Sequence, residues 1–212
     1  DKNKLAQSKL KKATFQDGIN EFVELREMLM QEMISWKHVL SPEDYCSIPF
    51  INADGYHSKT VAYSIWHIIR IEDIVVNSLI RRKKEVLFEN DFDKKIGAEI
   101  ITTGNELVKQ EIAEFSQKLN ITALYEYALL VKASTDEWLK SIHYEDIKKK
   151  FGDDDKKRIS ELGVVSADES AVWLIDYWCS KDISGLIKMP LSRHWIMHIE
   201  AANRIKEKIL DR

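Results

Sequence analysis

The sequence contains few of the residues that interrupt or cross-link a fold, with only 7 glycines, 3 prolines and 2 cysteines among 212 residues. So little turn chemistry argues against many short strands and favours long helices with few connections. Cys46 and Cys179 lie far apart and form no CxxC pair, so a disulfide framework is not expected. The composition therefore predicts an all-α protein of a reducing compartment, with a cytoplasmic location.

Several partner classes are also disfavoured by what is missing. Charged residues make up 32% of the chain, but the formal net charge is only −3, without the basic excess of a nucleic-acid-binding protein. No apolar run reaches the length of a membrane span, and no apolar stretch follows DKNKLAQSKLKK, so neither a membrane segment nor a signal peptide is expected. A chain of this length is sufficient for one domain, which we expect to span residues 1–212.

Four segments carry apolar residues at the three- and four-residue spacing of a helix: 14–39, 59–82, 121–142 and 190–210. The second of them is apolar almost all round and is therefore expected to be a central, buried helix. Four such helices bury their apolar faces best in a four-helix bundle. The connection at 143–189 is long enough to cross the bundle, so the spacing alone leaves the order of the helices open.

Shorter helical pieces are predicted between the long ones. Thr103 and Glu106 have capping-box spacing and predict a helix that runs to about Leu119. The sequence SADE at 166–169 predicts a short helix carrying several aromatic residues, and Pro190 is expected at the first position of the last helix. Residues 151–163 are polar and charged, which indicates a solvated surface segment.

The stretch SRHWIMHIE places His194 and His198 one helical turn apart, so that both imidazoles lie on one face. Imidazole nitrogen is a ligand for zinc, nickel, iron and copper, and of these we favour zinc or nickel. A zinc metalloprotease motif is excluded because Trp195 stands where the general-base glutamate would be. Two ligands make a weak site, so a third is required.

His67, in the middle of the most apolar helix, is the best candidate for the third ligand, because a buried neutral imidazole needs a hydrogen-bond partner or a metal ion. His57 in a predicted loop, His143 at a helix end and His38 at the end of the first helix are weaker candidates. The alternative is that all three buried histidines are ordinary core residues without a metal.

Three segments in this order, SIWHIIRIED, TALYEYALLVKASTDEWLKSI and PLSRHWIMHIEAANRI, resemble the DinB/YfiT-like family, the DNA-damage-inducible DinB superfamily. The resemblance covers residues 15 to 210. That family has one histidine within the second long helix and an HxxxH pair in the last, which here match His67, His194 and His198. The resemblance implies a four-helix bundle of up-down-down-up topology, a divalent metal held by these histidines, and a homodimer.

The resemblance also implies an activity. Family members with known activity include metal-dependent transferases that use bacterial thiols such as mycothiol or bacillithiol, so we expect transfer of a low-molecular-weight thiol to an electrophilic small molecule. A metal-bound water would instead give a hydrolase. A third possibility is a non-catalytic stress-response module that binds a small molecule or a partner, for which the aromatic segment 168–180 would matter most. The 143–189 insert departs from the simplest family pattern and is expected to cover the site.

Overall fold

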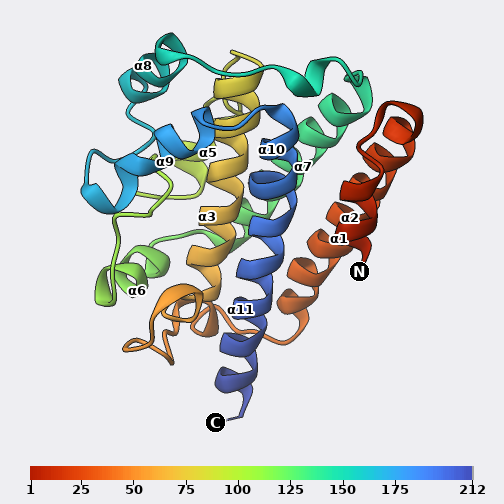
Figure 1. Cartoon of the computed structure of the whole chain (residues 1–212). Coiled ribbons are helices and arrows are strands. Elements are labelled where there is room, and N and C mark those ends of the chain that lie inside the picture. Colours follow the sequence, from red (N-terminus) through yellow and green to blue (C-terminus); the bar gives the residue numbers. More distant parts are fainter. Residues whose placement is uncertain (212) are drawn as a thin grey trace.

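The computed structural model describes residues 1–211, which form an all-α protein without a strand in the described part of the chain (Figure 1). Its α-helical segments are α1 (Lys2–Ser8), α2 (Phe15–Ser35), α3 (Val61–Asp73), α4 (Val86–Glu89), α5 (Phe92–Lys95), α6 (Gln110–Gln117), α7 (Ile121–Ser141), α8 (Asp153–Glu161), α9 (Glu169–Cys179), α10 (Ile183–Lys188) and α11 (His194–Leu210). Two π-helical segments extend this set: Ile74–Ile80 continues α3, and Met189–Arg193 joins α10 to α11.

The long helices α2, α3, α7 and α11 pack on one another. Helix α3 contacts both α7 and α11, and α2 contacts the same two helices from the other side (Figure 1). Every residue of α3 and of its π-helical continuation is buried, which confirms the prediction of a central helix at 59–82. All four predicted long helices are present, although their bounds differ from those expected, by a single residue for α7 and by more for the other three.

The ends of two of these helices are fixed by side-chain caps. The Thr60 hydroxyl accepts a hydrogen bond from the Tyr63 amide at 2.9 Å and so begins α3. Asn120 does the same for α7, where its side-chain oxygen accepts from the Ala123 amide at 3.0 Å. Both caps lie directly before an apolar stripe, and this arrangement explains why these helices begin where they do.

The predicted helix start at Thr103 is wrong, because α6 begins only at Gln110. Glu106 does not reach back to an amide at position 103; its carboxylate accepts instead from the Thr102 hydroxyl. Residues 101–104 form an irregular, non-helical segment whose carbonyl groups bind side chains of α3, as described below. These carbonyls are therefore committed to tertiary contacts and are not part of a helix.

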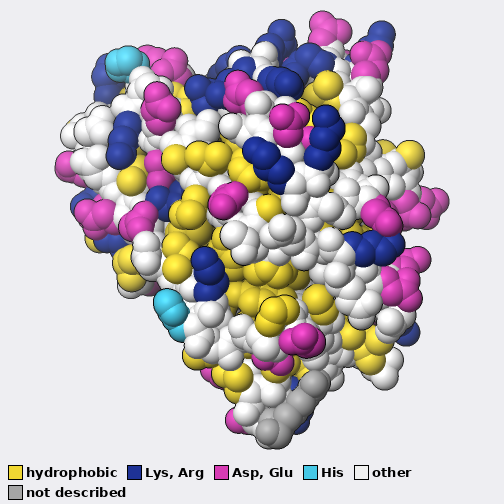
Figure 2. Space-filling model, turned by 180° about the vertical axis from the view of Figure 1, so that it is seen from behind, with side chains coloured by type: hydrophobic (Ala, Val, Ile, Leu, Met, Phe, Trp, Pro, Cys, Tyr) yellow, Lys and Arg dark blue, Asp and Glu magenta, His cyan; other side chains and the backbone are white. Residues whose placement is uncertain are grey.

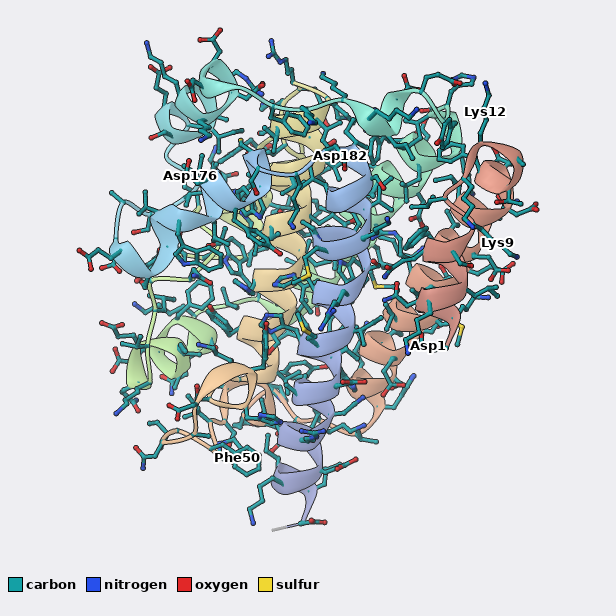
Figure 3. All side chains as sticks on the ribbon, viewed as in Figure 1. Asp1, Lys9, Lys12, Phe50, Asp176 and Asp182 are labelled. Atoms are coloured by element: carbon teal, nitrogen blue, oxygen red, sulfur yellow. The ribbon has the colours of Figure 1, made fainter. Side chains whose placement is uncertain are left out.

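The other two predicted starts also need correction. Helix α9 is capped by Asp168, which accepts from the Ser170 amide at 2.8 Å, and not by Ser166. Pro190 does not open the last helix but lies within the π-helical segment that follows α10. Helix α10 itself begins at Ile183, directly after its capping residue Asp182, which is labelled in Figure 3. Proline has no amide hydrogen to donate, and the wider π turn accommodates this loss without ending the helix.

Residues 151–163 are more ordered than predicted. They contain α8, whose polar face is exposed but whose Ile159 is completely buried against the rest of the molecule. The segment is therefore an amphipathic surface helix: its polar face is solvated, as predicted, while one apolar side chain packs inside. None of the helices in the described residues combines the length and apolar character that crossing a membrane requires.

Candidate metal centre

Three histidines from two helices meet inside the molecule. His67 comes from the middle of α3, while His194 and His198 occupy the first two turns of α11. Their ring centroids lie 5.1 Å (His67 to His194), 4.8 Å (His67 to His198) and 4.6 Å (His194 to His198) apart. One ring nitrogen of each lies within 4.8 Å of those of the other two, and all three side chains are buried. The predicted trio is thus brought together.

The packing of the two helices places this trio at a boundary. Along α3 and its π-helical continuation, Ile65, Ile68 and Ile69 belong to one apolar cluster, whereas Ile71 and Ile74 belong to a second. His67 lies among residues of the first cluster, close to this change, and His194 lies between Leu191 of the second cluster and Trp195 of the first. The buried histidines therefore lie near the place where the two apolar cores meet.

A backbone contact fixes the orientation of the His67 ring. Its Nδ1 lies 2.8 Å from the carbonyl oxygen of Thr103. A carbonyl only accepts, so Nδ1 must carry the proton, and Nε2 is left with a free lone pair. Metal-binding histidines are commonly held in this way, with one nitrogen donating to a carbonyl and the other bound to the ion. The Tyr63 ring, stacked at 5.5 Å and 11° to the His67 ring, restricts it further.

The Thr103 carbonyl is itself held by a ladder of contacts with α3. Four successive carbonyls accept hydrogen bonds from four side chains of this helix: Ile101 from Arg70 (2.6 Å), Thr102 from Trp66 (3.0 Å), Thr103 from His67 (2.8 Å) and Gly104 from Tyr63 (2.9 Å). The segment 101–104 thus runs along α3 in the opposite direction to it. Since each rung fixes its neighbours, the position of the Thr103 acceptor is well determined.

The other two histidines have no such partner. Nδ1 of His194 and Nδ1 of His198 are buried, and neither finds a hydrogen-bond partner within residues 1–211. Buried polar atoms in folded proteins are nearly always paired, so two orphaned imidazole nitrogens in one cluster need an explanation. Zinc bound by imidazole at about 2.0–2.1 Å would place the ligand nitrogens about 3.3 Å apart. The side chains would need to close in by an ångström or so to reach this geometry.

The electrostatics of the cluster favour neutral imidazoles. Burial lowers the pKa of His67 to about 4, although its bond to the Thr103 carbonyl opposes this shift. Burial also lowers the pKa values of His194 and His198 well below the usual value, and the neighbouring histidines add to the effect. The neutral imidazole is the form that binds metal ions. At neutral pH the cluster is therefore ready to bind an ion without first losing protons.

The trio faces a cavity of about 360 Å³. Its wall is mostly aromatic and apolar, and it is lined, besides the three histidines, by Gly55, Tyr56, Lys59, Tyr63, Ile71, Asn105, Trp173, Leu174, Tyr177, Trp178, Met189 and Pro190. This volume lies within the range of cavities that bind small molecules. The arrangement suits a metal ion at one wall and a small, partly apolar ligand beside it.

Helix α9 forms one wall of this cavity, as predicted for the 143–189 insert. Trp173, Leu174, Tyr177 and Trp178 of this helix line the space. The Asn105 side-chain amide donates a hydrogen bond to the Ser170 carbonyl, so the N-terminal turn of α9 is tied to the loop that carries the Thr103 acceptor. Asp176, labelled in Figure 3, lies on the same helix with its carboxylate exposed. The insert is therefore part of the site.

The remaining histidines lie elsewhere. His57 accepts a hydrogen bond from Arg204 at 2.9 Å and packs against Phe50, which Figure 3 labels in the loop between α2 and α3. His38 and His143 are exposed. The loop nevertheless reaches the cluster through another residue, because the Tyr56 ring meets the His198 ring edge-on at 4.6 Å.

Sequence reasoning missed three contributors to this site, namely Tyr56, Lys59 and Thr103. Thr103 acts through its backbone, and Tyr56 lies in a loop, so neither had a recognisable signal. Lys59 had a weak one, since a lysine just before a helix opposes the helix dipole and needs some other reason to be there.

Comparison with models of known protein families finds no match for this chain, and a search of curated proteins finds none either. The fold and the site define its class: an all-helical protein with a buried group of three histidines, His67, His194 and His198, that can hold a metal ion.

Proposed function

We propose that His67, His194 and His198 hold a divalent metal ion, zinc or nickel, and that the protein is a metal-dependent enzyme. The observation that carries this proposal is the pair of buried, unpartnered Nδ1 atoms beside a third imidazole whose Nδ1 is already bound to a carbonyl. A purely structural histidine cluster would be expected to satisfy its polar atoms. An ion bound by three imidazoles would leave a coordination position open toward the cavity.

The reaction that we favour is transfer of a low-molecular-weight thiol to an electrophilic small molecule. When bound, the metal ion would stabilise the deprotonated form of a thiol or of water and so supply a nucleophile at neutral pH. The chain's own residues support a thiol, because Tyr56, Trp173 and Tyr177 give the cavity an apolar wall. Such a wall favours a soft, weakly hydrated nucleophile and an apolar electrophile over water.

This proposal includes the family suggested by the sequence. We propose that the chain is a DinB-like four-helix bundle with up-down-down-up topology, in one domain of residues 1–212, and the contacts of α2 and of α3 with both α7 and α11 support this proposal. We propose that the protein acts in the cytoplasm as a homodimer, with small molecules and not nucleic acid or membrane as its partners. The formal net charge of −3 supports the exclusion of nucleic acid.

The proposed activity can be tested with untagged protein loaded with zinc, using cysteine as the thiol and 1-chloro-2,4-dinitrobenzene as the electrophile. We expect thiol-dependent consumption of the electrophile that the metal-free protein and the His194→Ala variant lack. His38→Ala, which changes an exposed histidine, is the control and should retain the rate. Equal rates in the zinc-loaded, metal-free and His194→Ala proteins would exclude the proposal. Turnover of a hydrolysable ester without any thiol would favour the hydrolase instead.

The second candidate is a binding module without turnover. It is favoured by Trp173, a large apolar side chain of α9 that is 48% exposed at the cavity wall. In such a protein the aromatic residues would matter and the histidines would not. A ligand that binds equally well to wild type and to the variant lacking all three histidines would support this function, especially if Trp173→Ala abolished its binding.

A further inference from the structure

One cation faces the cavity without an acidic partner. Lys59 lines the space together with the three histidines, and no aspartate or glutamate is among the lining residues within the described chain. Its ammonium group lies 5.2 Å from the centre of the Tyr63 ring, and it forms no ion pair with a carboxylate of residues 1–211. The lining of the cavity therefore carries a positive charge that no lining carboxylate compensates.

The position of Lys59 is unfavourable in the absence of a ligand. The side chain is half-buried, and burial lowers the pKa of its ammonium group because it loses water without gaining a counter-charge. Its charge also reaches the histidines, since it contributes to the lowered pKa values of His67 and His198. A divalent cation at the trio would add two more positive charges to a cavity with no negative one. An anionic ligand would relieve both costs.

We propose that the cavity binds a small carboxylate, with its carboxylate at the Lys59 ammonium, its apolar body against the aromatic wall of α9, and its reactive end toward the three histidines. The proposal deepens the proposed function by naming the substrate class, and for the reactive end it rests on that function. The volume of about 360 Å³ limits the ligand to a small molecule. A hydrogen bond between an ammonium and a carboxylate in a largely dry site is strong enough to select the anion over a neutral analogue.

The charge preference is tested on metal-free protein, so that it does not depend on the histidine site. Calorimetric titration compares phenylacetate with phenylacetamide, which has the same size and shape but no charge. We expect phenylacetate to bind at least tenfold more tightly to wild type, and Lys59→Gln to abolish this difference. Lys37→Gln is the matched control, since Lys37 also lies 5.2 Å from a tyrosine ring, that of Tyr125, but outside the cavity.

A preference for phenylacetate that persists in Lys59→Gln would overturn the proposal, and so would equal binding of the two compounds to wild type. Circular dichroism and the melting temperature establish that Lys59→Gln is folded. If that variant does not fold, Lys59→Arg provides the second test, because it keeps the charge and should keep the preference.

A second titration uses zinc-loaded protein with 3-mercaptopropionate and 2-mercaptoethanol. We expect the carboxylate-bearing thiol to bind more tightly, with this advantage lost in Lys59→Gln although that variant still binds zinc. If zinc does not bind at all, the proposed function fails, yet the result with phenylacetate still decides the role of Lys59. The failures of the two proposals are therefore distinguishable.

Discussion

At the scale of single residues, the site depends on imidazoles that burial keeps neutral. A charged imidazolium in this cluster would have no counter-charge, and a neutral one without a partner has an unsatisfied nitrogen. A bound cation resolves the second problem, because it accepts the lone pairs of all three rings, and its own charge is then balanced by an anionic ligand in the cavity. The same burial that makes the cluster costly in the free protein therefore favours a metal ion.

This burial predicts an acid-sensitive metal-free protein. His67 has a pKa of about 4 when folded, compared with 6.5 as its ordinary value. As pH falls below 6.5 the unfolded chain takes up a proton that the folded protein does not accept until about pH 4, so stability is lost across this window. Urea unfolding should show a loss from His67 on the order of 2 kcal/mol by about pH 5.

The variant His67→Asn is the comparison for this experiment, since its amide can still donate to the Thr103 carbonyl but does not titrate. Between pH 6.5 and about pH 5, the free energy of unfolding of His67→Asn should fall less steeply than that of wild type. His38→Gln, at an exposed histidine, should behave like wild type. An identical pH dependence in His67→Asn and wild type would contradict the assigned burial of His67.

Gly104 allows the support of His67 to be tested without touching a ligand. Its φ of +77° is unfavourable for other residues, and an added Cβ would lie 3.0 Å from Cε2 of Tyr63. We expect Gly104→Ala to lower the free energy of unfolding by about 1 kcal/mol or more. Displacement of the neighbouring Thr103 carbonyl should also weaken zinc binding about tenfold.

Gly163→Ala is the matched control for this variant. Gly163 has a similar φ of +67°, but its added Cβ would have no described atom within 4 Å. It should cost a comparable amount of stability and leave zinc affinity unchanged. If both variants weakened zinc binding equally, or neither did, the ladder along residues 101–104 would have no role in holding the site.

The candidate ligands could be predicted from sequence, whereas their supports could not. His194 and His198 share a helix, so spacing alone places them on one face, and His67 was recognisable from its apolar surroundings. Thr103 and Lys59 could not be found in this way. Their roles depend on a loop that folds back along α3 and on a cavity that only tertiary packing creates.

At the scale of helices, a buried guanidinium joins the parts of the molecule around the site. Arg26 of α2 binds Glu72 of α3 through two bonds of 2.6 and 2.8 Å, Asp136 of α7 at 2.7 Å, and the Leu191 carbonyl at 2.9 Å. Trp195, next to His194, donates to the same Glu72 at 2.8 Å. Burial opposes the charge on Arg26, but its two carboxylate partners raise its pKa overall, so it stays charged.

Removal of this guanidinium should be severe. Arg26→Met would leave Glu72 buried without a cationic partner and Asp136 with Lys132 alone, and we expect a loss of about 3–5 kcal/mol in the free energy of unfolding, measured by urea denaturation. Lys118→Met, which breaks an exposed ion pair with Glu99, is the control and should change stability little. A loss as small as that of the control would show that the Arg26 network does not hold the helices together.

The helices themselves were largely predictable from apolar spacing, but their ends were not. Capping-box spacing at Thr103 and at Ser166 pointed to starts that the structure does not use, because Thr102 and Asp168 make the competing side-chain bonds. The helix-opening role expected of Pro190 failed for a different reason. A π turn tolerates a residue that has no amide hydrogen, and the spacing of apolar residues does not distinguish a π turn from an α turn.

At the scale of the whole molecule, α9 of the insert and the long helices α3 and α11 together line the site. Seen from behind, acidic and basic side chains are interspersed around the rim of the face, while apolar side chains gather toward its middle (Figure 2). No single sign of charge dominates this face, which agrees with a small-molecule partner more than with nucleic acid.

Because the metal ligands come from two helices that only the folded protein brings together, metal binding should stabilise the entire fold. An ion that binds only the folded protein at a hundred times its dissociation constant adds about 2.7 kcal/mol. For a chain of this size we expect the melting temperature to rise by about 5–10 °C with zinc or nickel, and to return to its original value after chelation. The His67→Asn protein should show no such rise, and an equal rise in that variant would place the ion elsewhere.

The most direct measurement is the zinc and nickel content of untagged protein by elemental analysis, with calorimetric titration of the metal-free form. We predict about one ion per chain in wild type and in His38→Ala, and a near-complete loss in His67→Ala, His194→Ala and His198→Ala. Equal, substoichiometric metal in wild type and in these three variants would contradict the assignment of His67, His194 and His198 as a metal centre.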